Sequence, residues 1–141
     1  MARRKKGAQG KGERFLRLPH ILLKSEAWRS LSPAQRCVYI AIGEHYTGFN
    51  NGRIGLSVRQ AAELANVNKD TAGAAFRVLE ERGLIRKRKE GGFSYKVRHA
   101  TEWVLTAHPS GLNGEHPATQ EFRHWKPQEK SRSPRSGQTV P

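Results

Sequence analysis

The chain contains 141 residues, with 26 lysine and arginine residues against 12 aspartate and glutamate residues, which gives a formal net charge of +14 at pH 7. This length accommodates one compact domain with tails, and a charge of this sign attracts polyanions such as nucleic acid. No run approaches the roughly 18 apolar residues that a membrane span requires, and a single cysteine, Cys37, excludes an intramolecular disulfide.

The first predicted elements precede residue 57. Residues 1–14 are rich in arginine, lysine and glycine and predict a disordered basic arm. A helical turn over 25–29 would place Trp28 in the core. A capped helix is expected to start at Ser32-Pro33-Ala34-Gln35, and a short strand is expected over 53–56. The apolar stripe of that helix is predicted to comprise Ala34, Cys37, Val38, Ala41, Ile42 and Tyr46.

Two helices joined by a tight turn are predicted next. Ser57 and Gln60 form a second capping box before a short helix. The turn Asn66-Val67-Asn68 then leads into a longer helix over 69–82, whose apolar positions are spaced i, i+3, i+4, i+7, and Gly83 is the expected left-handed stop. Two helices joined in this way predict a helix-turn-helix.

The remaining sequence predicts a hairpin and a tail. A strand from Leu84 to Lys89, a turn at Glu90-Gly91-Gly92 and a returning strand over 101–106 would form a β-hairpin, the wing. Residues 107–141 contain five of the seven prolines and are expected to be a largely disordered Pro/Ser-rich tail. The motif Glu121-Phe122-Arg123-His124-Trp125 would then dock a protein partner or pack back on the domain.

Residues 60–85 read QAAELANVNKDTAGAAFRVLEERGLI. This segment resembles the signature of bacterial winged-helix regulators, in which an Ala/Leu/Val/Thr block precedes a Leu, Gly and Ile block. Over residues 15–106 the chain is similar to small winged-helix proteins of alphaproteobacterial plasmids, phages and integrated elements. The resemblance implies a mainly α domain with a small β-hairpin wing (α+β) over 15–106, and a cytoplasmic, nucleoid-associated protein that binds double-stranded DNA.

The exposed side of the second helix is the expected base-reading surface, because a helix-turn-helix presents this helix to the major groove. Arg77 is the best candidate for a bidentate guanine contact, unless it pairs with Glu81. Asn68 would read adenine or cap the helix, and Gly73 would serve packing or close approach to DNA. The predicted base-reading residues are Asn68, Lys69, Asp70, Gly73, Ala74 and Arg77.

Phosphate contacts are expected from the wing, the first helix of the motif, Thr71 and the basic arm. The predicted phosphate-contacting residues are Arg59, Thr71, Arg86, Lys87, Arg88, Lys89, Lys96, Arg98, Arg3, Arg4, Lys5 and Lys6.

The function expected from these features is sequence-specific DNA binding, as a transcriptional regulator of a mobile element or chromosomal locus. The alternatives are a replication-initiation or recombination accessory protein, an RNA-binding winged helix, and a protein-interaction winged helix. The six histidines lack metal-ligand spacing and no phosphate loop occurs, so we expect no catalytic residue, metal or cofactor. No membrane is expected as a partner. A homodimer on DNA and a protein partner for the tail stay open.

Overall fold

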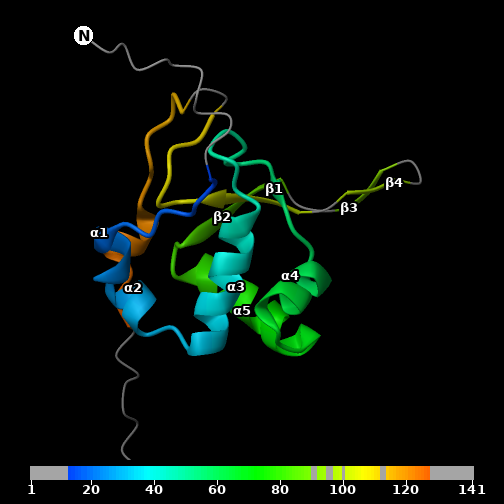
Figure 1. The fold of residues 1–141 in the computed structure, drawn as a ribbon, viewed down its shortest axis with the longest axis horizontal. Coiled ribbons are helices and arrows are strands. Elements are labelled where there is room, and N and C mark those ends of the chain that lie inside the picture. The colour runs from blue at the N-terminus through cyan, green and yellow to red at the C-terminus, as the bar shows by residue number, and fades with distance from the viewer. Residues whose placement is uncertain (1–12, 90–91, 95–96, 100, 112–113, 128–141) are drawn as a thin grey trace, which may run out of the picture.

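The computed structural model describes residues 13–89, 92–94, 97–99, 101–111 and 114–127. These form a mixed α+β arrangement of five α-helices and two antiparallel sheets (Figure 1). One sheet contains three strands and packs against the helices, and the other is a two-stranded hairpin that extends away from the body.

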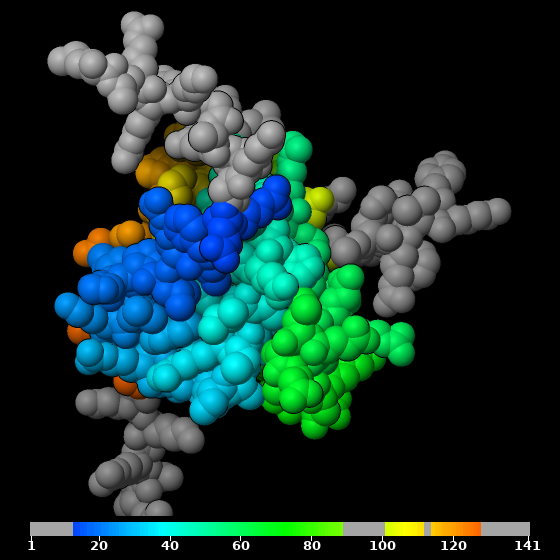
Figure 2. All heavy atoms as spheres, viewed as in Figure 1, coloured from blue at the N-terminus to red at the C-terminus, as the bar shows by residue number. Residues whose placement is uncertain are grey.

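Two short helices open the fold. Pro19 immediately precedes α1 (His20–Leu23), and the Ser25 side chain caps α2 (Glu26–Arg29) by accepting a hydrogen bond from the Trp28 N–H. Trp28 is buried and meets the Tyr39 ring edge-on, with 5.2 Å between the ring centroids. The predicted helical turn that seats Trp28 in the core is therefore confirmed. Figure 2 shows the N-terminal segment beside α3. In this contact the Leu16 side chain covers Gly43 and would have to shift if a Cβ were added there.

Helix α3 (Pro33–Glu44) begins as the sequence predicts, and Val38, Ala41 and Ile42 of its predicted apolar stripe are buried. The Ser32 side chain accepts from the Gln35 N–H while the Gln35 side chain accepts from the Ser32 N–H. The predicted stripe included Cys37 and omitted Tyr39, yet Cys37 is exposed and Tyr39 is fully buried. This part of the prediction was wrong because contact with Trp28 draws the buried face toward the N-terminal helices.

Helices α4 (Val58–Ala65) and α5 (Lys69–Glu81) pack against each other and against α3. Asn66 ends α4 in a left-handed conformation, and the Val67 N–H donates to the Ala62 carbonyl. The three-residue connection is the predicted one, and so is the second capping box. The predicted apolar positions of α5 are all buried in the core: Ala72, Ala75, Phe76 and Leu79.

Gly83 follows the end of α5, and two observations explain why a glycine stands there. Its φ of +75° lies in the left-handed region that glycine adopts without strain. A Cβ at Gly83 would also lie 3.0 Å from the carbonyl carbon of Glu121. The Leu84 N–H donates to the Leu79 carbonyl across this turn, which directs the chain from the helix into the sheet.

The three-stranded sheet has the order β1 (Ile54–Gly55), β5 (Glu102–Leu105), β2 (Ile85–Lys89). Trp103 on the central strand pairs with Ile54 on one side and Lys87 on the other. A β-bulge follows Lys87. Because side chains alternate along a strand, Trp103 faces the helices, where its ring lies 5.3 Å from that of Phe76.

The hairpin beyond this sheet differs from the prediction. Strands β3 (Gly92–Ser94) and β4 (Val97–His99) pair with each other, and Gly92 lies opposite His99. The predicted turn at Glu90-Gly91-Gly92 is therefore wrong for Gly92, because glycine can extend a two-stranded ladder as well as it can turn one. The chain reverses between Ser94 and Val97, and residues 90–91 lie outside the described ranges.

The C-terminal segment belongs to the fold, so the predicted end of the domain at residue 106 is too early. The Gln120 N–H donates to the Thr106 carbonyl, and the 3₁₀ helix η2 (Glu121–His124) contacts α1 and α2. Phe122 is fully buried in the core, and Trp125 packs against it. Of the open alternatives for this motif, the structure supports packing back on the domain; residues 128–141 lie outside the described ranges.

Arg82 links the end of α5 to this segment. Its guanidinium lies 4.6 Å from the centroid of the Trp125 ring, and Nη1 donates to the Ala27 carbonyl and to the Ser30 hydroxyl. Burial lowers the pKa of Arg82, and the Glu81 carboxylate acts in the opposite direction. The side chain therefore acts as a structural connection between three segments.

Candidate nucleic-acid interface

The exposed side of α5 carries most of the residues predicted to read bases. Lys69, Asp70 and Arg77 are exposed, whereas Gly73 and Ala74 are half-buried. All five lie on α5 away from its buried positions. The fold therefore brings these predicted residues together on one face.

Arg77 has no partner among the described residues that would hold its side chain against the protein. Within the part of the chain that the structure describes, no ion pair joins Arg77 to Glu81 or to another carboxylate. The alternative in which Arg77 pairs with Glu81 is therefore not what the structure contains. An exposed, unpaired guanidinium at this position is available to a planar acceptor pair such as a base edge.

Asn68 caps α5, which was one of the two roles predicted for it beside reading adenine. Its Oδ1 accepts a hydrogen bond of 2.7 Å from the Thr71 N–H. A bidentate contact with adenine needs both the carbonyl oxygen and the amide nitrogen of asparagine. Because the cap holds Oδ1 against the Thr71 N–H, a bidentate contact would require Asn68 to share this oxygen or to leave the cap. The half-buried Thr71, predicted to contact phosphate, contributes its backbone N–H to the cap.

Packing among the described residues does not require a glycine at position 73. A Cβ built there would meet a single neighbour, Val58 Cγ1, at an ordinary contact distance of 3.7 Å. Glycine inside a helix costs about 1 kcal/mol relative to alanine. Of the two reasons considered for this glycine, packing against the described residues does not account for it, and close approach of an external partner remains.

We therefore predict that Gly73→Ala raises the free energy of unfolding by about 1 kcal/mol. Urea unfolding followed by circular dichroism would measure this change. Ala74→Gly, at the next residue of the same helix, is the matched reverse substitution and should lower the free energy of unfolding by a similar amount. A destabilised Gly73→Ala protein would show that packing does require the glycine.

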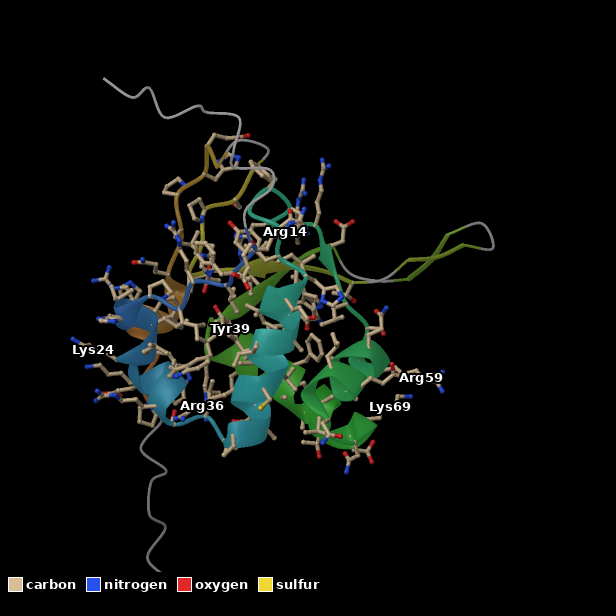
Figure 3. All side chains as sticks on the ribbon, in the orientation of Figure 1. Arg14, Lys24, Arg36, Tyr39, Arg59 and Lys69 are labelled. Atoms are coloured by element: carbon tan, nitrogen blue, oxygen red, sulfur yellow. The ribbon has the colours of Figure 1, made fainter. Side chains whose placement is uncertain are left out.

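Arg59 and Lys69 form a basic edge beside α5. Both side chains are exposed, and both lie in the first turn of a helix: Arg59 is the second residue of α4 and Lys69 is the first residue of α5. Figure 3 shows them extending on the same side of the molecule, the side toward which the β3–β4 hairpin projects. Lys24 lies on the opposite side in the same view. The N-terminal turns of α4 and α5 thus present positive charge in one direction.

The basic residues predicted on β2 do not form one surface. Lys87 lies on the helix side of the sheet, with Nζ 3.8 Å from Glu80 Oε2 and 5.8 Å from the centroid of the Trp103 ring. Arg86 pairs in register with Val104 and faces the other side, where its Nε lies 3.5 Å from Glu121 Oε1. Arg88 lines a pocket on that same outer face.

Two glutamates that the sequence analysis did not assign to the site thus partly neutralise it. Glu80 is seven residues from Lys87 and Glu121 is 35 residues from Arg86, so no helical or strand spacing connects either pair. Arg86 and Arg88 are not brought together with Lys69 and Arg77. Five predicted contacts lie outside the described residues: Arg3, Arg4, Lys5, Lys6 and Lys96. For Lys89 and Arg98, only their places on β2 and β4 are defined.

Comparison with known proteins gives no relative from which a function could be transferred. No protein-family model, curated protein sequence or solved structure matches this chain. Among the residues that the structure describes, no group of three or more histidine, cysteine, aspartate and glutamate side chains could hold a metal ion. No helix in these ranges has both the length and the apolar character needed to cross a bilayer. The functional argument therefore depends on the geometry of the site.

Proposed function

We propose that this chain is a winged helix-turn-helix protein that binds double-stranded DNA in a sequence-dependent manner and acts as a transcriptional regulator. The observation that carries the proposal is the exposed face of α5. It follows a three-residue turn from α4, carries the unpaired Arg77, and is bordered by Arg59 and Lys69. This combination of small central residues and peripheral positive charge suits the major groove of DNA.

In the proposed complex, α5 enters the major groove and Arg77 donates two hydrogen bonds to the O6 and N7 atoms of guanine. Gly73 and Ala74 present little side-chain volume, so the helix backbone can approach the base edges. Arg59 contacts a phosphate and fixes the orientation of the helix, while Lys69, at the first position of α5, lies beside the base edges. The β3–β4 hairpin extends on the same side and is the proposed wing.

The first experiment compares nucleic acids rather than variants. Fluorescence anisotropy of the full chain would measure its affinity for duplex fragments enriched from a random pool, for unrelated duplexes, and for an RNA hairpin at several salt concentrations. We expect the enriched duplex to bind most tightly, with affinity falling linearly on a log–log salt plot. Equal or tighter binding of the RNA hairpin would refute the proposal and favour an RNA-binding function.

Arg77→Ala tests which residue reads the sequence. We expect a loss of roughly 1–3 kcal/mol on the enriched duplex and little loss on unrelated duplexes, because a base contact is specific whereas a phosphate contact is not. Lys24→Ala removes the same charge from the opposite side of the molecule and should leave the preference unchanged. If Arg77→Ala weakened both duplexes equally, Arg77 would be a phosphate contact.

A further inference from the structure

The outer face of the three-stranded sheet carries a pocket that the proposed DNA surface does not use. The pocket has a volume of about 550 Å³ and lies between the sheet, the loop before β1 and the segment after β5. Arg53, Arg86, Arg88 and Val104 line it from the sheet. Because Val104 is adjacent to the helix-facing Trp103, this face points away from α5. Its volume lies within the range of small-molecule sites.

Among the described residues, two of the three arginines that line this pocket have no carboxylate partner. Glu121 holds Arg86, whereas within the described residues no ion pair involves Arg53 or Arg88, and both are exposed. Glu115 is the single acidic residue among the described lining residues. Two guanidinium groups in a concave site provide charged, forked donors that match a phosphate.

The position of Arg88 is defined by the backbone around it. Arg88 is the extra residue of the β-bulge between Lys87 and Lys89, and bulges commonly redirect a side chain. It reaches across the central strand to Gly52, where an added Cβ would lie 3.2 Å from Arg88 Cδ and 3.7 Å from Val104 Cγ2. Gly52 has a φ of +98° and its N–H donates to the Trp103 carbonyl. The glycine therefore leaves the space that Arg88 occupies.

An exposed aromatic ring borders the same pocket. Phe49 is 74% exposed, and it lines the pocket together with His116. A planar heterocycle stacked on such a ring would cover apolar surface that now faces water. The pocket therefore combines a stacking surface with two unpaired guanidinium groups.

We infer that this pocket binds a nucleoside monophosphate, with the phosphate on Arg53 and Arg88 and the base against Phe49. The site is separate from α5, so the inference does not depend on DNA binding. A single-stranded nucleic acid end carries the same chemistry, and the experiment distinguishes the two sources.

Isothermal titration calorimetry of the full chain would use the monophosphates of adenosine, guanosine, cytidine and uridine, with adenosine and inorganic phosphate alone as fragments. We expect one monophosphate to bind at a single site. Each fragment of that ligand should bind with an affinity that is lower by about tenfold or more. Arg88→Gln and Phe49→Ser should each weaken binding about tenfold. Arg77→Ala and Lys24→Ala should leave it unchanged.

Both pocket residues are exposed, so their variants should unfold at the same temperature as the parent protein, which circular dichroism would verify. Absence of binding by all four monophosphates would overturn the inference, as would binding that neither pocket variant weakens. A short single-stranded oligonucleotide should also be titrated. If it bound more tightly than any monophosphate and Arg88→Gln abolished this binding, the ligand of the pocket would be a nucleic acid end and not a free nucleotide. Retained binding when Arg77→Ala has lost DNA recognition would support a separate site.

Discussion

Phe122→Ala is expected to lower the free energy of unfolding by about 3–5 kcal/mol. Phe122 lies 16 residues beyond Thr106, in a segment whose prolines suggest disorder, yet its side chain is fully buried. It belongs to the same core cluster as Trp28 and Leu22, which the short helices α1 and α2 contribute. Removing the ring would leave a cavity between these elements that the closely packed neighbours cannot fill.

Urea unfolding of the full chain would measure the effect, with Phe49→Ala as the matched control. Phe49 is 74% exposed, so the same substitution there should change stability by no more than about 0.5 kcal/mol. A similar small change for Phe122→Ala would mean that the C-terminal segment does not contribute to the core. That result would restore a domain boundary near residue 106.

The helix starts and the buried face of α5 were predictable because they depend on nearby residues. Ser57 and Gln60 are three residues apart, and their reciprocal hydrogen bonds form whenever the helix forms. The same holds for Ser32 and Gln35 at the start of α3. Gly83 stops α5 through its own backbone conformation. These features need no tertiary contact to be specified.

Tertiary contacts decided the features that were not predictable. Cys37 and Tyr39 are both compatible with an apolar stripe, and only the position of Trp28 determines which of them is buried. Phe122 and Trp125 are isolated among polar residues and prolines, so no periodic pattern marks them as core. The same limit applies to Gly92, whose backbone freedom fits a turn and a strand equally well.

The candidate site also has one part that was predictable from the sequence and one part that was not. The exposed face of α5 follows from helical periodicity, so its residues were identified together. The basic residues of β2 read as one positive run in the sequence, but alternation places Lys87 and Arg86 on opposite faces, and distant glutamates pair with both. Arg53 becomes informative only once the sheet brings it beside Arg88.

Asn51→Asp is expected to cost roughly 3–5 kcal/mol at neutral pH, because it places an uncompensated charge in a buried site. Asn51 is 5% exposed, and its Oδ1 accepts a hydrogen bond of 2.7 Å from the Leu105 N–H. Its Nδ2 donates to the carbonyl oxygens of Leu105, His108 and Pro109 at 2.9–3.0 Å. In aspartate, an anionic oxygen would face these three carbonyl oxygens with no proton between them.

The pH dependence of this penalty identifies its cause. Burial and the facing carbonyl oxygens would raise the pKa of the introduced carboxyl above its value in the unfolded chain. The folded state would then bind more protons than the unfolded state, so the penalty should shrink as the pH falls toward the ordinary aspartate pKa of about 4. A protonated carboxyl can again donate to one carbonyl.

Urea unfolding of Asn51→Asp and of the parent protein at several pH values would measure this difference. Asn68→Asp makes the same chemical change at the exposed cap of α5, where a carboxylate accepts from the Thr71 N–H and favours the helix N-terminus. The control should therefore lose little stability at neutral pH. A penalty at Asn51 that did not vary with pH would point to lost hydrogen bonds alone. A penalty that fell on acidification would show that the loss comes from a negative charge facing three carbonyl oxygens, at the site where the Asn51 amide joins the loop before β1 to the C-terminal segment.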